Sequence, residues 1–114
     1  MINNVILVGR TTDDIKVNTT SDGRKVATIT LAVIRPFKSA ETGEYETDFI
    51  PVVLWEGIVE SMASLVKKGS TIGVKGRLNM KYLEINDQKY KTIEMIGERV
   101  TYINLKTSSQ TEEL

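Results

Sequence analysis

Hydrophobic and polar positions alternate along most of the chain, and this period of two is typical of β-strands. The longest such stretches are residues 25–35, where Pro36 then ends or bends the strand, and residues 46–55. A strand over residues 2–9 is apolar on both faces, which suggests that a partner chain or a second layer covers it. The remaining strands are predicted at residues 71–83, 89–96 and 99–105.

Residues 57–68 change to a helical period. Their apolar side chains form a single stripe along one helix face: Ile58, Val59, Met62, Leu65 and Val66. Lys67, Lys68 and Gly69 are typical of a helix C-terminus, which favours cations and a glycine. The predicted order is three strands, one helix between the third and fourth strands, and then the rest of the sheet, which residues 89–96 and 99–105 finish. This order indicates an all-β OB-fold, a five-stranded Greek-key barrel with extended β-hairpins.

Aromatic side chains mark a candidate binding face. Phe49 and Trp55 are six positions apart on one predicted strand, so both point to the same side. If the aliphatic side of that strand lines the core, the two aromatics lie outside; the alternative, in which they form the core, stays open. Phe37 follows the preceding strand and either contacts a ligand or packs against its own hairpin.

Cationic side chains accompany these aromatics. Arg35 and Lys38 lie next to Phe37, and three cations on the predicted strand 71–83 have the parity opposite to its aliphatic residues: Lys75, Arg77 and Lys81. Sequence-independent binding of single strands needs this combination, because cations track the phosphates while aromatic faces stack on unpaired bases. The alternative is an ordinary solvated sheet face.

Composition excludes several other kinds of site. A chain of 114 residues favours one domain. The absence of cysteine and histidine excludes disulfides, thiolate metal sites and histidine-based catalytic triads. Lys+Arg and Asp+Glu number 15 each, which argues against a histone-like polycation but not against a local basic cluster.

Acidic residues gather near the predicted hairpin tip at Ser39 to Tyr45. A metal-dependent nuclease using Glu44, Glu46 and Asp48 is one interpretation, and a solvated hairpin is favoured over it. We therefore expect no catalytic residue, no metal and no cofactor.

The ends of the chain predict where the protein works. The first residues lack the features of a secretory signal, and no apolar run approaches the ~18 residues that span a bilayer, so a cytoplasmic location is expected. Residues 105–114 are polar and are predicted to form a short flexible tail after a domain at residues 1–104.

Several motifs together resemble the bacterial single-stranded DNA-binding protein (SSB) family. They cover residues 1 to about 103 in the family's order and spacing. The matching segments are residues 1–10, 23–33, 42–44, 48–55, 68–70 and 74–78. The resemblance implies an OB-fold that coats single-stranded DNA without sequence preference, near the nucleoid, in replication, recombination, repair or DNA uptake.

The family's stacking aromatics fall on particular positions here. Phe37, Phe49 and Trp55 match three of them. Counting from Gly76 puts the fourth at Leu83, whereas a one-residue bulge would assign it to Tyr82. Pro51 stands where the family often has a basic or polar residue, so one phosphate contact is absent.

The resemblance also implies partners. It implies a homotetramer whose dimers pair through the first strand. Housekeeping members end in a long linker and an acidic tip with a Pro-Phe pair that recruits other enzymes, whereas this chain ends in Thr111 to Leu114, which puts such recruitment in doubt. A rival interpretation is an OB-fold module in which the aromatics bind a replication or recombination protein.

Overall fold

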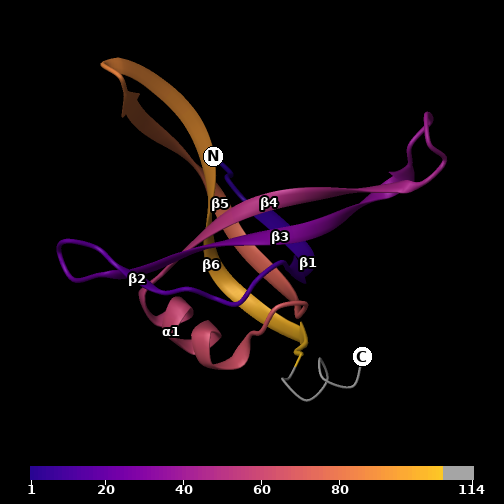
Figure 1. Cartoon of the computed structure of the whole chain (residues 1–114), viewed down its shortest axis with the longest axis horizontal. Coiled ribbons are helices and arrows are strands. Elements are labelled where there is room, and N and C mark those ends of the chain that lie inside the picture. Colours follow the sequence, from indigo (N-terminus) through magenta and orange to yellow (C-terminus); the bar gives the residue numbers. More distant parts are fainter. Residues whose placement is uncertain (107–114) are drawn as a thin grey trace.

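The computed structural model describes residues 1–106, which form six strands and one helix (Figure 1). The elements are β1 (Val5–Thr11), β2 (Asn18–Thr19), β3 (Lys25–Lys38), β4 (Tyr45–Trp55), α1 (Glu56–Leu65), β5 (Thr71–Ile85) and β6 (Gln88–Asn104). The short β2 was not predicted. The predicted tail falls on residues 105–114, of which 107–114 lie outside the described residues.

Five of the strands close into a barrel. The sheet runs β1-β5-β6-β4-β3-β2, and an additional pairing of β1 with β3 closes the five strands other than β2 into a ring. All neighbours are antiparallel except β4 and β6, which pair in parallel at Val52–Met95 and Val53–Ile96. The helix lies between β4 and β5 in sequence, so the predicted OB-fold is confirmed.

The core follows from the alternation of side chains along the strands. On β3 and β4 the buried residues are every second one, as in Ala27, Ile29 and Leu31. The helix α1 packs against β3, β4 and β6 and contributes Val59 and Met62 to the core. The other buried apolar residues are Val52, Leu54, Val66, Ile72, Val74 and Met95.

Three glycines lie where a neighbouring strand or the core leaves no space for a side chain. A Cβ at Gly9 would lie 2.6 Å from the carbonyl oxygen of Ala32 on β3. A Cβ at Gly76 would lie 1.9 Å from the carbonyl oxygen of Ile96. A Cβ at Gly97 would lie 2.5 Å from Leu54 in the core. No larger residue fits any of these positions without displacing its neighbours.

Two long hairpins project from the barrel in different directions (Figure 1). The β5–β6 hairpin turns at Asn86 and Asp87, both with positive φ, as the sequence predicted for a turn. The β3–β4 hairpin continues past Pro36 to Lys38, with an irregular register between Ile34 and Lys38. Pro36 therefore disturbs this strand without ending it.

Two sequence predictions about element ends are wrong. The helix ends at Leu65, because Val66 has an extended backbone, and its last turn holds no cation; Gly69 belongs instead to the turn before β5. Residues 88–104 form one strand rather than two, because Glu98 is accommodated as a β-bulge between Gly97 and Arg99.

The first strand is also less buried than its pattern predicted. It begins at Val5, and its Ile6 and Val8 side chains are exposed within a single chain. Within residues 1–106, no second layer covers them. Only the other face, with Val5 and Leu7, packs against the core.

We predict that Gly97→Ala lowers the free energy of unfolding by about 1–3 kcal/mol, because the new methyl group overpacks the core. Gly57→Ala is the matched control, since a Cβ there meets nothing within 4 Å and alanine favours a helix. Denaturant unfolding of both variants measures the difference. Equal stability of the two variants would contradict the packing argument.

Candidate nucleic-acid interface

The outer face of the β3–β4 ribbon presents the two predicted strand aromatics. Phe49 pairs with Ala32 and Trp55 with Val26, so both lie on the face opposite the buried Val52 and Leu54. Phe49 is 65% exposed, and Trp55 is half-buried. The alternative in which these aromatics form the core is therefore wrong.

Between the two aromatics the outer face is flat and nearly uncharged. Thr30 pairs with Pro51, and Thr28 pairs with Val53. Such short side chains leave room for a planar ligand to lie across the strands. Pro51 donates no hydrogen bond and has no charge, as the sequence indicated.

Phe37 lies further out, towards the tip of the β3–β4 hairpin. It is 62% exposed, so it is not packed into its own hairpin. Together with Arg35, Lys38 and Glu46 it lines an open cavity of about 490 Å³ at the tip. The Nζ atom of Lys38 lies 5.8 Å from the ring centroid of Tyr45, so the tip pairs cations with aromatic surface.

Register brings one unpredicted cation to the aromatic face. Arg10 on β1 pairs with Ala32 on β3, and Ala32 pairs with Phe49 on β4. Paired residues point to the same side of a sheet, so Arg10 and Phe49 flank the small Ala32. Arg10 is exposed and has no carboxylate within 4 Å among residues 1–106. The sequence does not predict this position of Arg10, because it depends on the pairing of three strands that are far apart along the chain.

Arg35 is held by carboxylates on the other side of the ribbon. Its guanidinium lies 2.6 Å from Glu46 Oε2 and 2.9 Å from Asp48 Oδ1. The hydrogen bond from Arg35 keeps the pKa of Asp48 below its ordinary value and raises the pKa of Arg35 itself. The charge of Arg35 is therefore already balanced in the free protein.

The ion pairs of Glu46 and Asp48 with Arg35 argue against the interpretation as a metal-dependent nuclease. Glu46 and Asp48 both face Arg35, whose positive charge occupies the position that a cation would take. Within residues 1–106, no three aspartate or glutamate side chains come together in a way that could hold a metal ion.

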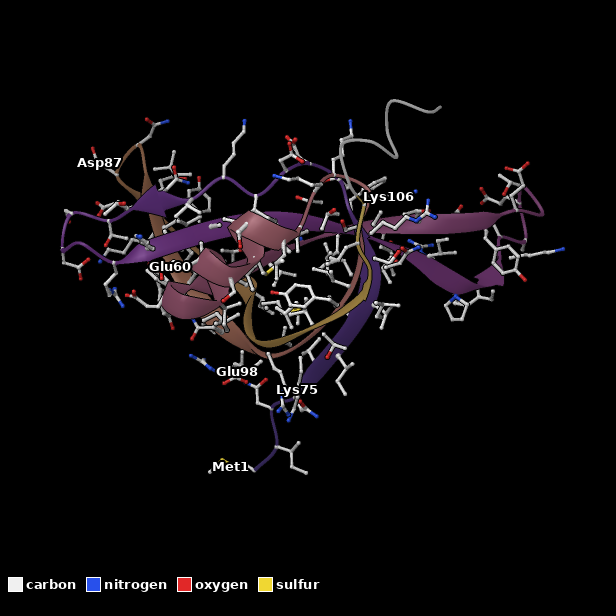
Figure 2. All side chains as sticks on the ribbon, turned by 90° about the horizontal axis from the view of Figure 1, so that it is seen from below. Met1, Glu60, Lys75, Asp87, Glu98 and Lys106 are labelled. Atoms are coloured by element: carbon white, nitrogen blue, oxygen red, sulfur yellow. The ribbon has the colours of Figure 1, made fainter. Side chains whose placement is uncertain are left out.

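The three predicted cations of β5 lie away from the aromatic face. The strand β6 separates β5 from β4, and on its other side β5 pairs with β1, where Lys75 lies opposite Ile6. Figure 2 shows Lys75 on the same side of the molecule as Met1. Arg77 Nε lies 3.9 Å from Glu98 Oε2, and Lys81 Nζ lies 3.9 Å from Glu94 Oε2.

The β5–β6 hairpin offers more than one aromatic for the fourth position. The register is regular from Gly76 to Ile85, so no bulge lies within this stretch of β5. Tyr82, 69% exposed, and its neighbour Leu83 therefore point to opposite faces. Tyr90 lies across from Leu83 and is also exposed. A cross-strand partner of this kind was not visible in the sequence.

A second unpredicted cation lies directly over Trp55. The Cζ atom of Arg24 is 4.6 Å from the centroid of the indole ring, within the range of cation–π contact. Arg24 comes from the turn before β3, which lies close because Val26 pairs with Trp55.

OB-fold barrels form a class of domains that bind oligonucleotides or oligosaccharides on the face of their second and third barrel strands and the adjoining loops. The sequence profile described as the Single-strand binding protein family matches residues 2–103. The chain therefore belongs to the single-strand binding protein family, and the predicted resemblance is confirmed.

Individual relatives agree with this assignment. The chain is 46% identical to "Single-stranded DNA-binding protein 3" of Listeria innocua over 108 residues, which are 93% of this chain and 66% of that protein. It is 48% identical to the "Single-stranded DNA-binding protein" of Streptococcus pneumoniae, over 86% of this chain and 63% of that protein. The chain thus spans about two thirds of the length of these relatives.

A solved structure has the same fold. A structure titled "Plasmodium falciparum SSB complex with ssDNA" superposes with a TM-score of 0.76, covering 91% of this chain and 96% of that chain at 23% identity. No helix in residues 1–106 has the length and apolar character needed to cross a membrane.

We predict that Arg35→Ala returns the pKa of Asp48 towards its ordinary value, because the bond that lowers it is removed. Since the folded pKa lies below the unfolded one, the pair stabilises the fold above the ordinary pKa of 3.8 and loses this effect as the pH falls through the folded value. Carboxyl NMR titration measures the shift. Lys38→Ala is the control, and an Asp48 pKa unchanged by Arg35→Ala would contradict the assignment.

Proposed function

We propose that this protein binds single-stranded DNA without sequence preference. The observation that supports it most is the pair Phe49 and Trp55, which share the flat outer face of an OB-fold barrel in a member of this family. Every base has a π-face, so stacking on aromatics is tolerant of sequence and is worth about 1–3 kcal/mol per base. Residues 1–104 would form the binding domain, with residues 105–114 as a tail.

The stacking residues in this proposal follow the face and the two hairpins. Phe49 and Trp55 form the centre, and Phe37 extends the path towards the β3–β4 tip. Because β5 has no bulge between Gly76 and Ile85, the family's fourth position falls on Leu83; Tyr82 is proposed to receive DNA on the β5–β6 hairpin because its ring is 69% exposed. Tyr90 is a further candidate on the opposite face of that hairpin, because it is exposed beside Leu83.

Phosphate contacts would come from cations around this path. Arg10 is the best placed, since it flanks Phe49 across Ala32. The cations proposed from the sequence are Arg35, Lys38, Lys75, Arg77 and Lys81. Of these, Arg35 contributes least to net attraction because two carboxylates balance it. The cations of β5 would act only if DNA wraps around the barrel beyond the β3–β4 ribbon.

We propose that the chain acts as a homotetramer. β1 pairs with β5 from Val5 to Arg10 but with β3 only at Arg10 and Thr11. Among residues 1–106, the edge of β1 from Val5 to Gly9 thus has no strand on one side, which suits addition of the same strand from a second copy. The exposed Ile6 and Val8 beside this edge would be covered by such pairing.

In the cell, the protein would protect single strands during replication, recombination, repair or DNA uptake, in the cytoplasm and next to the nucleoid. It would need no metal and no cofactor and would catalyse no reaction. Recruitment of other proteins through a C-terminal tip is not part of the proposal.

We predict that Trp55→Ala weakens binding to oligo(dT) by about 1–3 kcal/mol, because one stacking platform is lost. Trp55→Phe should keep most of the affinity, since it retains an aromatic face. Fluorescence anisotropy of a labelled oligonucleotide gives the affinities, and circular dichroism verifies folding. Wild-type affinity of a folded Trp55→Ala variant would exclude Trp55 from the DNA path.

We predict that Val8→Glu lowers the oligomeric state, because it places a charge in the proposed contact between first strands. Ile85→Glu is the control, since Ile85 is also exposed but lies at the end of the β5–β6 hairpin. Light scattering after size exclusion should give about four chain masses for the wild type and the control. A wild type that elutes as a monomer would refute the tetramer.

A further inference from the structure

In the free protein, the side chain of Arg24 lies over the indole ring of Trp55. The Arg24 Cζ atom lies 4.6 Å from the indole centroid. A stacked base needs roughly 3.5–4 Å on each of its faces, so a base placed between Arg24 and Trp55 would require about twice that distance. Arg24 and a base therefore cannot share this face of Trp55 in the arrangement that the structure shows.

The turn before β3 fixes the position of Arg24. The amide of Arg24 donates to Thr20 Oγ1 at 3.1 Å, and the amide of Thr20 donates to the Arg24 carbonyl at 2.8 Å. Gly23 has a φ of +88°, which favours glycine and completes the turn. The backbone of Arg24 is thus anchored beside Trp55, whichever way its side chain points.

The side chain of Arg24 is held more weakly than its backbone. Its Nε atom lies 3.1 Å from Oδ2 of Asp22. The other carboxylate oxygen of Asp22, Oδ1, accepts a hydrogen bond from the Thr20 hydroxyl. The side chains of Arg24 and Asp22 are 57% and 60% exposed, so water and salt screen this ion pair. Base stacking on an aromatic is stronger than either an exposed ion pair or an exposed cation–π contact.

We infer that Arg24 is a displaceable cover on Trp55 and that a nucleobase takes its place when DNA binds. The displaced guanidinium then pairs with the phosphate of the nucleotide that stacks on Trp55, because its anchored backbone keeps it within reach. This inference rests on the proposed function. It gives Arg24 two opposed effects, since it competes with the base before binding and attracts the phosphate afterwards.

The test uses the fluorescence of Trp55, the chain's single tryptophan. In the free protein, Arg24→Ala should increase quenching of Trp55 by acrylamide, because the ring becomes accessible. It should also reduce the magnitude of the slope of log K against log salt by about 0.7, the value for one phosphate contact on a single strand. Affinity for oligo(dT) relative to wild type should therefore rise with salt concentration.

Two further variants separate the effects. Arg24→Lys should restore the salt slope while leaving Trp55 more accessible than in wild type, because an ammonium covers less of the ring than a guanidinium. Lys25→Ala is the matched control: Lys25 is the adjacent cation, but its Nζ lies 2.8 Å from Glu60 on α1. It should change neither quenching nor slope.

The outcomes distinguish this inference from the proposed function. Unchanged quenching or an unchanged salt slope in Arg24→Ala overturns the inference, even if Trp55→Ala still weakens binding. Full affinity of Trp55→Ala overturns stacking on Trp55 and the displacement with it. Thermal unfolding of Arg24→Ala verifies that the exposed substitution leaves the fold intact.

Discussion

The structure depends on close packing between the strands of the barrel and against its core. At Gly9 and Gly76, strands approach to distances that leave no space for a Cβ, and at Gly97 the core fills the space where one would lie. Because β1 bends in towards β3 only near its C-terminal end, the barrel closes there and opens towards the N-terminus. The closure that forms the core thus also creates the free edge on which the proposed assembly depends.

Side chains alternate between the two faces of the β3–β4 ribbon, so one face lines the core and the other carries the exposed aromatics. Residues such as Val52 and Leu54 point inward and are completely buried, while Phe49 and Trp55 point outward. The aromatic positions Phe49 and Trp55 are therefore held directly over the buried core. Phe37 and Tyr82 lie towards the hairpin tips, farther from the core. The proposed DNA path therefore runs from the barrel surface onto the two projecting hairpins.

Much of this arrangement could be predicted from the sequence, because alternation within one strand is a local property. The strands and the helix follow from patterns of a few neighbouring residues, and their order along the chain indicates the OB-fold. The same alternation places Phe49 and Trp55 on one face of β4, but only the burial of Val52 and Leu54 shows that this face is the outer one. The helix end was misjudged because Val66 turns into the core before the lysines are reached.

Contacts between strands could not be predicted in this way. Arg10 reaches Phe49 only through the register of three strands, and Tyr90 meets Leu83 only through the hairpin pairing. Lys75 shares the sequence pattern of a binding residue, yet β6 separates its strand from β4. The position of Arg24 over Trp55 depends on the conformation of a turn, and the alternation of polar and apolar residues does not predict where a side chain in a turn points.

The alternation along β4 also limits how the chain can change in length. Phe49 and Leu54 lie on opposite faces of one strand, so a single residue inserted between them would turn one part of the strand over. An aromatic residue would then point into the core, and an aliphatic residue would take its place on the outer face. The turn at residues 39–44 has no such constraint, because it lies beyond the paired strands. We therefore expect this domain to accept insertions and deletions at the hairpin tips, where they would change the length of the hairpins and leave Phe49 and Trp55 on the outer face.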